Sequence, residues 1–563
     1  MARECTRATR RAWLKQAAAL ATMVPCSTLL WSGRARASDL SLGDRIKSLY
    51  SNQFHFNDRG EPQITVGIVQ HVERVTISAA AGLLVLPSGA GGTTIEGGTR
   101  FDITLHDGHP AKQRFAVVLE ELAGPAMSAI DRAASRWRKL DFDVADHEVG
   151  TVFGVGGRVL DNRRVLLVVE RHGSEEDARR RAEVLRQRHG ALGKLHPIIE
   201  QRGHGALRAH DVEHGLRVAA DGVLWFASKD GGPITVHGVP LESNGKGPPR
   251  VEAREYRGGI YVAVDRRGKL SVANLVSEGD MLSGLVPAEI FASGPMAALE
   301  AQAVAARGQL LAKIGTRHLD DPFLLCSEQH CQVYAGRIRE HERTNLAVKS
   351  TMGAVAMRPS ETQLVDTVYS ANCGGHSEDN DVVWPSAPDP QLRGRPDPLL
   401  KERFAKGIDA TNIEAFLRES PRSYSTPEAE VGRQAYRWRE VVDPTKLAGQ
   451  PGINAELGTV RELKVLARGT SGRATGLRVI AERGEVDVLG ELRIRRALGG
   501  LRSSLFIVER ERDASGGIVL TGGGHGHGVG LCQHGAMGMA KAGKTHEEIL
   551  AHYYRDAKIN KLW

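Results

Sequence analysis

The chain has 563 residues, of which 41% are hydrophobic and 25% are charged, and its formal net charge at pH 7 is +8. This composition is typical of a globular protein, and it excludes collagen-like, disordered and polytopic membrane chains. At roughly 150 residues per domain, the length predicts about three or four domains.

Residues 1–37 have the pattern of a cleaved export signal. A basic segment precedes an apolar stretch at 17–31, and Ala35-Arg36-Ala37 forms a small-x-small cleavage site. The apolar stretch contains Pro25 and is short for a membrane-spanning helix, so we expect no transmembrane segment in the mature chain. Residues 9–15 are similar to the twin-arginine consensus, which addresses folded proteins for export. A general secretory signal that holds two adjacent arginines is the alternative.

The leader also changes the meaning of the net charge. It holds seven Lys or Arg residues and one acid, Glu4, which leaves 68 basic and 66 acidic residues in the remaining chain. The mature protein is therefore nearly neutral, and we expect no nucleic-acid partner. The predicted location is the periplasm or the cell wall, with the twin-arginine route favoured.

The next two regions differ in their predicted secondary structure. Residues 38–140 alternate short apolar runs with glycine-rich breaks, at 64–69, 82–86 and 101–105, which predicts a β-rich region. Residues 141–200 contain a strand at 164–170 and then a helix from Glu175, capped by Ser174 and followed by Gly190. This strand–helix piece resembles the SPOR peptidoglycan-binding module; a generic α/β insertion is the alternative.

Residues 201–563 form the last predicted region. A hairpin is expected at 261–274 and an apolar-faced helix at 296–314. A surface insertion at about 385–435 contains a Pro/Asp-rich loop and a short helix at 411–418. The predicted fold class is α+β, with β-rich N-terminal modules and a mixed α/β domain.

Residues 538–545 match the phosphate-loop pattern letter by letter. A genuine phosphate loop needs a buried strand directly before it, and none is predicted there. Gly543 is better explained as the glycine between two helices, the second of which is capped by Thr545 and Glu548. We therefore expect no nucleotide cofactor.

Glu289 is the first candidate catalytic residue. It lies among the apolar residues of 286–291, and burial disfavours the charged form of a carboxyl group. A carboxyl group that stays protonated near neutral pH can act as a general acid. Alone this is a weak signal, because most such glutamates are exposed or ion-paired.

Cys326, His330 and Cys331 cluster in the sequence, with His318 upstream. Thiolate and imidazole together favour tetrahedral zinc, although this spacing is not that of a standard zinc finger. Disulfides are the competing interpretation, because an exported chain keeps an even number of cysteines, the other two being Cys373 and Cys532.

Two further segments contain polar residues in unusual surroundings. In 370–378, Cys373 and His376 suggest a cysteine–histidine pair, but spacing alone identifies no base. In 522–530 glycines alternate with other residues, which allows the backbone to approach a ligand or another segment closely.

Five segments in this order, 286–291, 298–307, 330–334, 370–378 and 526–536, resemble the stage II sporulation protein D / amidase enhancer LytB (SpoIID/LytB) family. The similarity spans roughly 255–560, with a weaker echo at 64–105. It departs from the family pattern at His525, where many relatives have an aromatic residue, and at Cys532, where serine is frequent. The resemblance implies a SpoIID-like domain that acts on peptidoglycan, with the catalytic glutamate at Glu289.

The resemblance also implies a reaction and a set of ligands. Characterised family members are lytic transglycosylases, which cleave the MurNAc–GlcNAc bond of denuded glycan strands and leave a 1,6-anhydro sugar. Some carry zinc, which maps onto Cys326, His330 and Cys331, with His318 as a candidate fourth ligand. Candidates for sugar contacts, each with a packing or capping role as its alternative, are Gln302, Arg307, Ser370, His376, His527 and Gln533.

The rival function is non-catalytic: a peptidoglycan-binding protein that enhances a cell-wall amidase. The sequence contains 12 Phe, 7 Trp and 9 Tyr, which is few for a groove that stacks sugars. This favours recognition of the glycan through hydrogen bonds.

Overall fold

The computed structural model describes residues 49–50, 55–57, 60–87, 93–124, 126–241, 250–328, 330–384, 386–400, 402–427 and 434–563. The predicted export signal at 1–37 lies outside these residues. The described part mixes helices and strands and is rich in strands toward its N-terminal side, which confirms the predicted α+β class. No helix among the described residues is long and apolar enough to cross a membrane.

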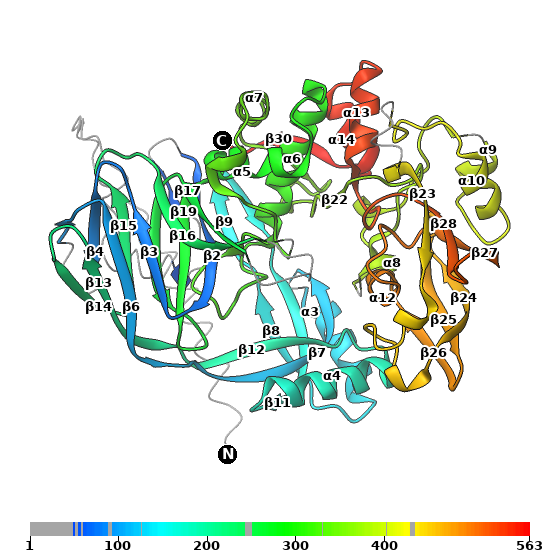
Figure 1. Cartoon of the computed structure of the whole chain (residues 1–563), viewed down its shortest axis with the longest axis horizontal. Helices are drawn as coiled ribbons and strands as arrows, with labels where there is room; N and C mark the ends of the chain where they lie inside the picture. The colour runs from blue at the N-terminus through cyan, green and yellow to red at the C-terminus, as the bar shows by residue number, and fades with distance from the viewer. Residues whose placement is uncertain are drawn as a thin grey trace. The chain divides into compact units, whose positions relative to one another are not determined.

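Two sheets form the first part of the core, and both are antiparallel apart from β20 (Leu325–Cys326), which pairs in parallel with Val66 and Gly67 in the first sheet. They combine strands from 55–109 with strands from 204–277, which lie side by side in space (Figure 1). The first sheet runs in the order β1 (His55–Phe56), β2 (Pro62–Val72), β19 (Leu270–Ser277), β18 (Gly259–Val264), β15 (Val223–Ser228), β4 (Leu83–Pro87), β5 (Ile95–Glu96). The second runs in the order β14 (Arg217–Asp221), β13 (His204–Asp211), β6 (Arg100–His109), β3 (Arg74–Ser78), β16 (Ile234–Pro240), β17 (Val251–Tyr256). The predicted hairpin is confirmed, because β18 pairs with β19.

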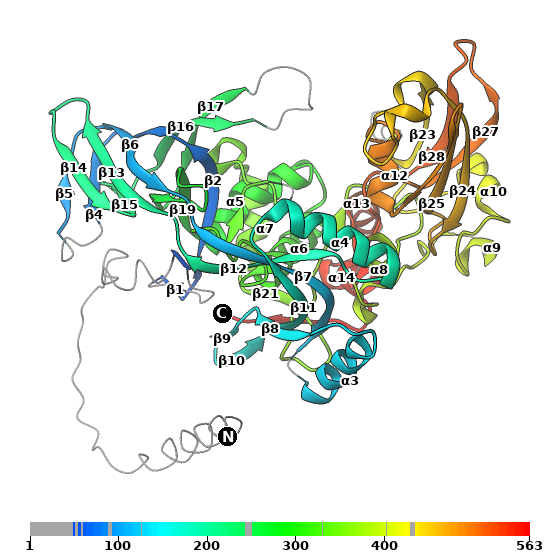
Figure 2. The same ribbon diagram turned by 90° about the horizontal axis from the view of Figure 1, so that it is seen from below.

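Between these two sets of strands, the chain forms a separate α/β unit. Its elements are β7 (Lys112–Ala123), α3 (Met127–Arg138), β8 (Ala145–Val149), the hairpin β9 (Val152–Val155) and β10 (Arg158–Asp161), β11 (Arg164–His172), α4 (Glu175–His189) and β12 (Lys194–Gln201). The strand order β12-β7-β11-β8 and the β-α-β-β-α-β succession are those of a ferredoxin-like fold. Figure 2 shows α3 and α4 beside these strands.

The ferredoxin-like unit differs from the predicted 141–200 segment at its start. It begins at Lys112, because β7 is its first strand along the chain and pairs with both β11 and β12. Within the unit, the helix prediction is confirmed at both ends. The Ser174 side chain accepts a hydrogen bond from the Asp177 N–H, and Gly190 adopts the left-handed conformation.

The helical part is built around α6 (Met296–Lys313), which confirms the helix predicted at 296–314. It contacts α5 (Glu278–Glu289), α7 (Glu342–Ser350), α13 (Gln533–Lys541) and α14 (His546–Tyr553), and Figure 1 shows these helices together. Small buried residues such as Ala301 and Ala305 let the neighbouring helices approach closely. Because α6 is buried nearly all round, it is a core element and not a surface helix.

Residues 538–545, which match the phosphate-loop pattern, begin inside a helix. Gly538 lies inside α13, and Gly543 connects α13 to α14 with a positive φ of 84°. The Thr545–Glu548 capping box is present at the start of α14. No phosphate-binding turn forms here.

A second hydrophobic core holds most of the remaining chain. It contains two three-stranded sheets and the helix α12 (Glu491–Ala497). The sheets are β23 (Arg437–Val442), β28 (Ile518–Gly523), β27 (Phe506–Arg512), and β24 (Val460–Arg468), β25 (Ala474–Ala481), β26 (Gly484–Leu489). The predicted insertion at 385–435 contributes α9 (Glu402–Ala405) and α10 (Ile413–Glu419), whose Phe404 and Phe416 pack with Leu505.

Candidate functional site

Glu289 is the last residue of α5, and not a residue of the loop before α6. The helix is anchored by Met281, Leu282 and Leu285, which are fully buried, whereas Glu289 is half-buried. Helix dipoles place partial negative charge at this end of a helix, which favours the protonated form of a carboxyl group. The position therefore suits a proton donor.

The Glu289 carboxyl group interacts with the hydroxyl group of Tyr369. Burial raises the pKa of Tyr369 well above its usual range, and the neighbouring Glu289 carboxylate and its hydrogen bond raise that pKa further. The tyrosine hydroxyl therefore keeps its proton and can donate it in a hydrogen bond to Glu289. Nothing in the sequence singled out Tyr369, which lies 80 positions away along the chain.

Tyr369 is positioned by pairing between two very short strands. It belongs to β22 (Tyr369–Ser370), which pairs in parallel with β29 (Leu531–Cys532). The Ser370 hydroxyl accepts a hydrogen bond of 3.2 Å from the Gly528 N–H. Two of the predicted segments, 370–378 and 526–536, are thus brought together beside Glu289.

His527 contacts two backbone groups of the same arrangement. Its Nδ1 accepts a hydrogen bond of 3.0 Å from the Val529 N–H, and the ring also bonds to the backbone carbonyl of Tyr369. Burial lowers the pKa of His527 to about 3, helped by the positive charges of Arg473 and Arg495. His527 is therefore a neutral histidine that helps to hold Tyr369 in place. The centroid of its ring lies 4.9 Å from that of the Trp384 ring.

The glycines before β29 are required by close contacts, as predicted. Gly528 has φ of 79°, and a Cβ atom there would lie 2.4 Å from the guanidinium carbon of Arg473. Gly526 has φ of 95°, and its Cβ would lie 2.9 Å from that of Ser370. Both the backbone conformation and the space therefore select glycine.

Two of the proposed sugar-contact residues meet each other. Gln533 donates a hydrogen bond of 3.2 Å from its Nε2 to the Oε1 atom of Gln302. Both side chains are buried, and Gln302 Nε2 has no partner within the described residues. This pair links α6 to α13.

Arg307 and His376, two more of the proposed sugar-contact residues, are buried and hydrogen-bonded within the protein. Arg307 is fully buried. Its Nε donates a hydrogen bond of 2.6 Å to the Glu278 carboxylate, and its Nη1 donates hydrogen bonds to the carbonyl groups of Thr351 and Ala354. His376 is 1% exposed, and its Nδ1 lies 2.7 Å from its neighbour's carbonyl oxygen. For these two residues the geometry corresponds to the packing alternative, because neither side chain reaches solvent where a sugar could bind.

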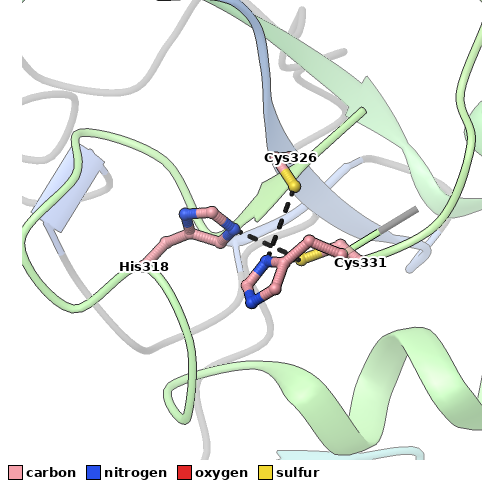
Figure 3. Close-up of side chains that lie close together, drawn as sticks. His318, Cys326 and Cys331 are labelled. Atoms are coloured by element: carbon pink, nitrogen blue, oxygen red, sulfur yellow. Dashed lines mark hydrogen bonds between the residues drawn. The ribbon is translucent and has the colours of Figure 1, made fainter. Parts of the chain in front are cut away.

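The four candidate metal ligands come together, and Figure 3 shows His318, Cys326 and Cys331 pointing toward one another. The Cys331 Sγ atom lies 3.3 Å from His318 Nε2 and 3.7 Å from His330 Nδ1. All four ligand atoms lie within 4.8 Å of one another. Two thiols and two imidazoles in such a group are the ligand set of a closed tetrahedral site.

A carboxylate orients one of these ligands. The Nδ1 atom of His318 lies 2.9 Å from Asp321 Oδ2, which leaves Nε2 directed at the cluster. Such carboxylate–histidine pairs fix the tautomer of metal-binding histidines. Asp321 was not among the residues predicted from the sequence, although its position three residues after His318 was a usable signal.

All four cysteines of the described residues carry free thiols. Cys373 and Cys532 are buried and adjacent, because the Cys373 N–H lies 3.2 Å from the Cys532 sulfur. The Cys532 sulfur also accepts the Gly535 N–H and so caps α13. Among the described residues, the Cys373 thiol has Cys532 and Ser425 as side-chain partners, and neither is an imidazole base.

Two family models match the chain. Residues 266–357 match a family described as Stage II sporulation protein. Residues 378–530 match a family described as Domain of unknown function (DUF8618). The first range contains Glu289 and all four candidate metal ligands, and the second contains the second hydrophobic core.

Curated relatives are similar at 27% identity. Stage II sporulation protein D of Bacillus amyloliquefaciens matches over 350 residues, 59% of this chain and 87% of that protein. The amidase enhancer of Bacillus subtilis (strain 168) matches over 291 residues, 48% of this chain but only 39% of that protein. An uncharacterized protein of Brachyspira hyodysenteriae matches over 353 residues, 61% of this chain and 79% of that protein.

Proposed function

Because the chain carries a SpoIID domain and is related to stage II sporulation protein D and the LytB amidase enhancer, we propose that it acts on the bacterial cell wall as a peptidoglycan lytic transglycosylase. Its substrate would be glycan strands stripped of stem peptides, and the bond cleaved would be that between MurNAc and GlcNAc. Export to the periplasm or cell wall, by the twin-arginine route, is part of this proposal.

The observation that carries the proposal is the pairing of Glu289 with Tyr369. The carboxyl group stands at the end of α5, half-buried, with a hydroxyl that keeps its proton beside it. No second carboxylate is required for this reaction, because the substrate supplies its own nucleophile. That distinguishes it from hydrolases, which use two carboxyl groups and a water molecule.

The proposed reaction moves one proton out and one back. Glu289 donates its proton to the glycosidic oxygen as the bond from that oxygen to C1 of MurNAc breaks. The C6 hydroxyl of the same sugar then forms a bond to C1, and the Glu289 carboxylate takes its proton. The products are a 1,6-anhydro sugar and a free hydroxyl on GlcNAc, and Glu289 is protonated again.

The decisive experiment is the Glu289→Gln substitution. Glutamine has nearly the same shape but cannot donate an acidic proton, so release of 1,6-anhydro products should fall by about 10²- to 10⁴-fold. The chain from residue 38 onward would be incubated with denuded glycan strands, and the products would be measured by mass spectrometry. Glu342→Gln, an exposed glutamate in the first turn of α7, is the control and should keep full activity. Equal products from Glu289→Gln and the unaltered chain would refute the role of Glu289.

The rival is a wall-binding protein that enhances an amidase, which the name of the Bacillus subtilis relative suggests. It predicts binding of the glycan without 1,6-anhydro products, together with faster release of stem peptides when an N-acetylmuramoyl-L-alanine amidase is added. The same incubation, with and without amidase, separates the two functions.

We also propose that His318, Cys326, His330 and Cys331 hold a zinc ion. Zinc bound by four protein ligands has no open position for substrate, so it supplies structural cross-linking and not chemistry. The residues would hold together the segment that follows α6.

A further inference from the structure

We propose that Phe291 and His534 form an aromatic subsite that binds the apolar face of a sugar ring next to Glu289. The inference rests on the proposed glycan substrate. It adds an aromatic contact to a site for which the low number of aromatic residues in the sequence predicted recognition through hydrogen bonds.

Phe291 lies two residues after Glu289, just beyond the end of α5. Between them Ile290 is extended, with φ of −129° and ψ of 148°, and its own side chain is only 4% exposed. Glu289 is half-buried at the end of α5, whereas Phe291 is among the exposed large apolar residues. The chain therefore returns to the surface directly after Ile290, two residues from Glu289.

The segment that carries Phe291 is held in one conformation. The Gly294 N–H donates a hydrogen bond of 2.9 Å to the Phe291 carbonyl, which closes a tight turn. The Arg343 side chain on α7 also donates a hydrogen bond of 3.0 Å to the Ala292 carbonyl and one of 2.7 Å to the Gly294 carbonyl. The ring is therefore displayed from a fixed backbone, which lowers the entropic cost of binding a ligand.

The Phe291 side chain is 67% exposed, although it is a large apolar group next to the candidate catalytic residue. Its ring meets that of His534 at 81° with 6.5 Å between centroids, an edge-to-face arrangement.

His534 connects this subsite to the other side of the site. Its Nδ1 lies 2.7 Å from the carbonyl oxygen of Ala371, the residue after β22. Burial lowers the pKa of His534, so the ring is neutral near pH 7. The aromatic pair is thereby joined both to α5, which carries Glu289, and to the strand that carries Tyr369.

The chemistry of this pair suits a pyranose ring. One face of such a sugar exposes C–H groups with slight positive charge, which rest favourably on the negative face of an aromatic ring. A neutral N-acetylated hexose fits this surface better than an anion, because neither ring carries charge.

Binding would be measured with the full chain carrying Glu289→Gln, so that the strands are not consumed, by calorimetry with denuded glycan strands as the probe. In this Glu289→Gln background, the further substitution Phe291→Ala should weaken binding of the strands by about threefold to tenfold, the range that aromatic contacts of this kind contribute. Phe291→Trp in the same background should keep the affinity. Leu346→Ala on α7 removes a side chain that is 55% exposed and serves as the matched control.

The outcomes separate this inference from the proposed function. If Phe291→Ala binds as tightly as Leu346→Ala, the subsite is refuted while the role of Glu289 stands. With Glu289 intact, Phe291→Ala should raise KM and leave kcat unchanged, because stacking contributes equally to substrate and transition state. Failure of every form to bind the strands would refute both proposals.

Discussion

Tyr369 is the side chain whose contact with Glu289 bears most directly on the proposed reaction. A hydrogen bond donated to a carboxylate stabilises the charged form and fixes its orientation. Tyr369 acts on the proposed reaction through its hydrogen bond to Glu289, so it is a positioning residue.

Tyr369→Phe removes only this hydroxyl group. A hydrogen bond to a charged group contributes about 1.5–3 kcal/mol, so we expect kcat to fall by about ten- to hundredfold. The basic limb of the pH–rate profile should also move upward, because the charged form of Glu289 loses its donor. Steady-state rates from pH 5 to 9 would test this. Tyr334→Phe, which loses a hydroxyl bond of 2.9 Å to Asn274, should alter stability without moving the profile. An unmoved profile and unchanged kcat in Tyr369→Phe would contradict the assignment.

Residue types and spacing identified some site residues but not their partners. His318, Cys326, His330 and Cys331 lie within 14 positions, so local spacing was enough to group them. Tyr369 reaches Glu289 only through strand pairing with residues 531–532, which no local pattern encodes. Arg307 has the appearance of a charged functional residue, but its partner Glu278 lies 29 positions upstream and both are buried.

At the scale of elements, local signals predicted helices well and strand partners poorly. The caps of α4 and α14 depend on residues within four positions, and both form as expected. The sheet of the ferredoxin-like unit needs β7, whose partners β11 and β12 follow 41 or more residues later. Hydrophobic alternation predicts a strand, but it does not say which sheet the strand joins.

The segment between α6 and α7 provides the prediction about metal. Among its described residues, the regular structure is limited to β20 (Leu325–Cys326) and a short 3-10 turn at Gly336–Arg339, so cross-linking by zinc should stabilise it. We expect one zinc per chain by elemental analysis, with loss of zinc and a lower unfolding midpoint in Cys331→Ser. Chelation should expose two further thiols to a thiol reagent, namely Cys326 and Cys331.

Cys373→Ser is the control for this measurement. Cys373 is buried beside Cys532 and belongs to no candidate metal group, so its substitution should leave zinc content at one per chain. A metal-free chain in which Cys326 and Cys331 resist the thiol reagent until reduced would support a disulfide and refute the zinc site.

On the scale of the molecule, α6 connects parts of the chain that are far apart in sequence. The Asn162 side chain of the ferredoxin-like unit donates a hydrogen bond of 2.8 Å to the Ile314 carbonyl at the end of this helix. Gln302 meets Gln533 of α13, and Arg307 meets Glu278 of α5. Burying a polar group costs free energy that its hydrogen bonds must offset, so we expect the described core to lose stability cooperatively when a buried group is forced to change charge.

Buried histidines make such a change accessible to acid. Burial lowers the pKa of His376, which is 1% exposed, to about 4, and that of His527 to about 3. In the unfolded chain both groups titrate near the ordinary value of 6.5. Their contribution to stability is therefore complete above pH 6.5 and is lost as pH falls toward 4 and then 3, because protons bind the unfolded chain first. For His376 the full effect is on the order of 3 kcal/mol.

The unfolding midpoint should therefore drop between pH 7 and pH 4.5, and His376→Gln should flatten that drop, since glutamine does not titrate. Comparing single variants across the same pH range isolates the histidine from the buried carboxyl groups, which are the same in each. His210→Gln, at an exposed position on β13, should follow the pH dependence of the unaltered chain. If His376→Gln lost as much stability between pH 7 and pH 4.5 as His210→Gln, the buried neutral histidine would not be the acid-sensitive group.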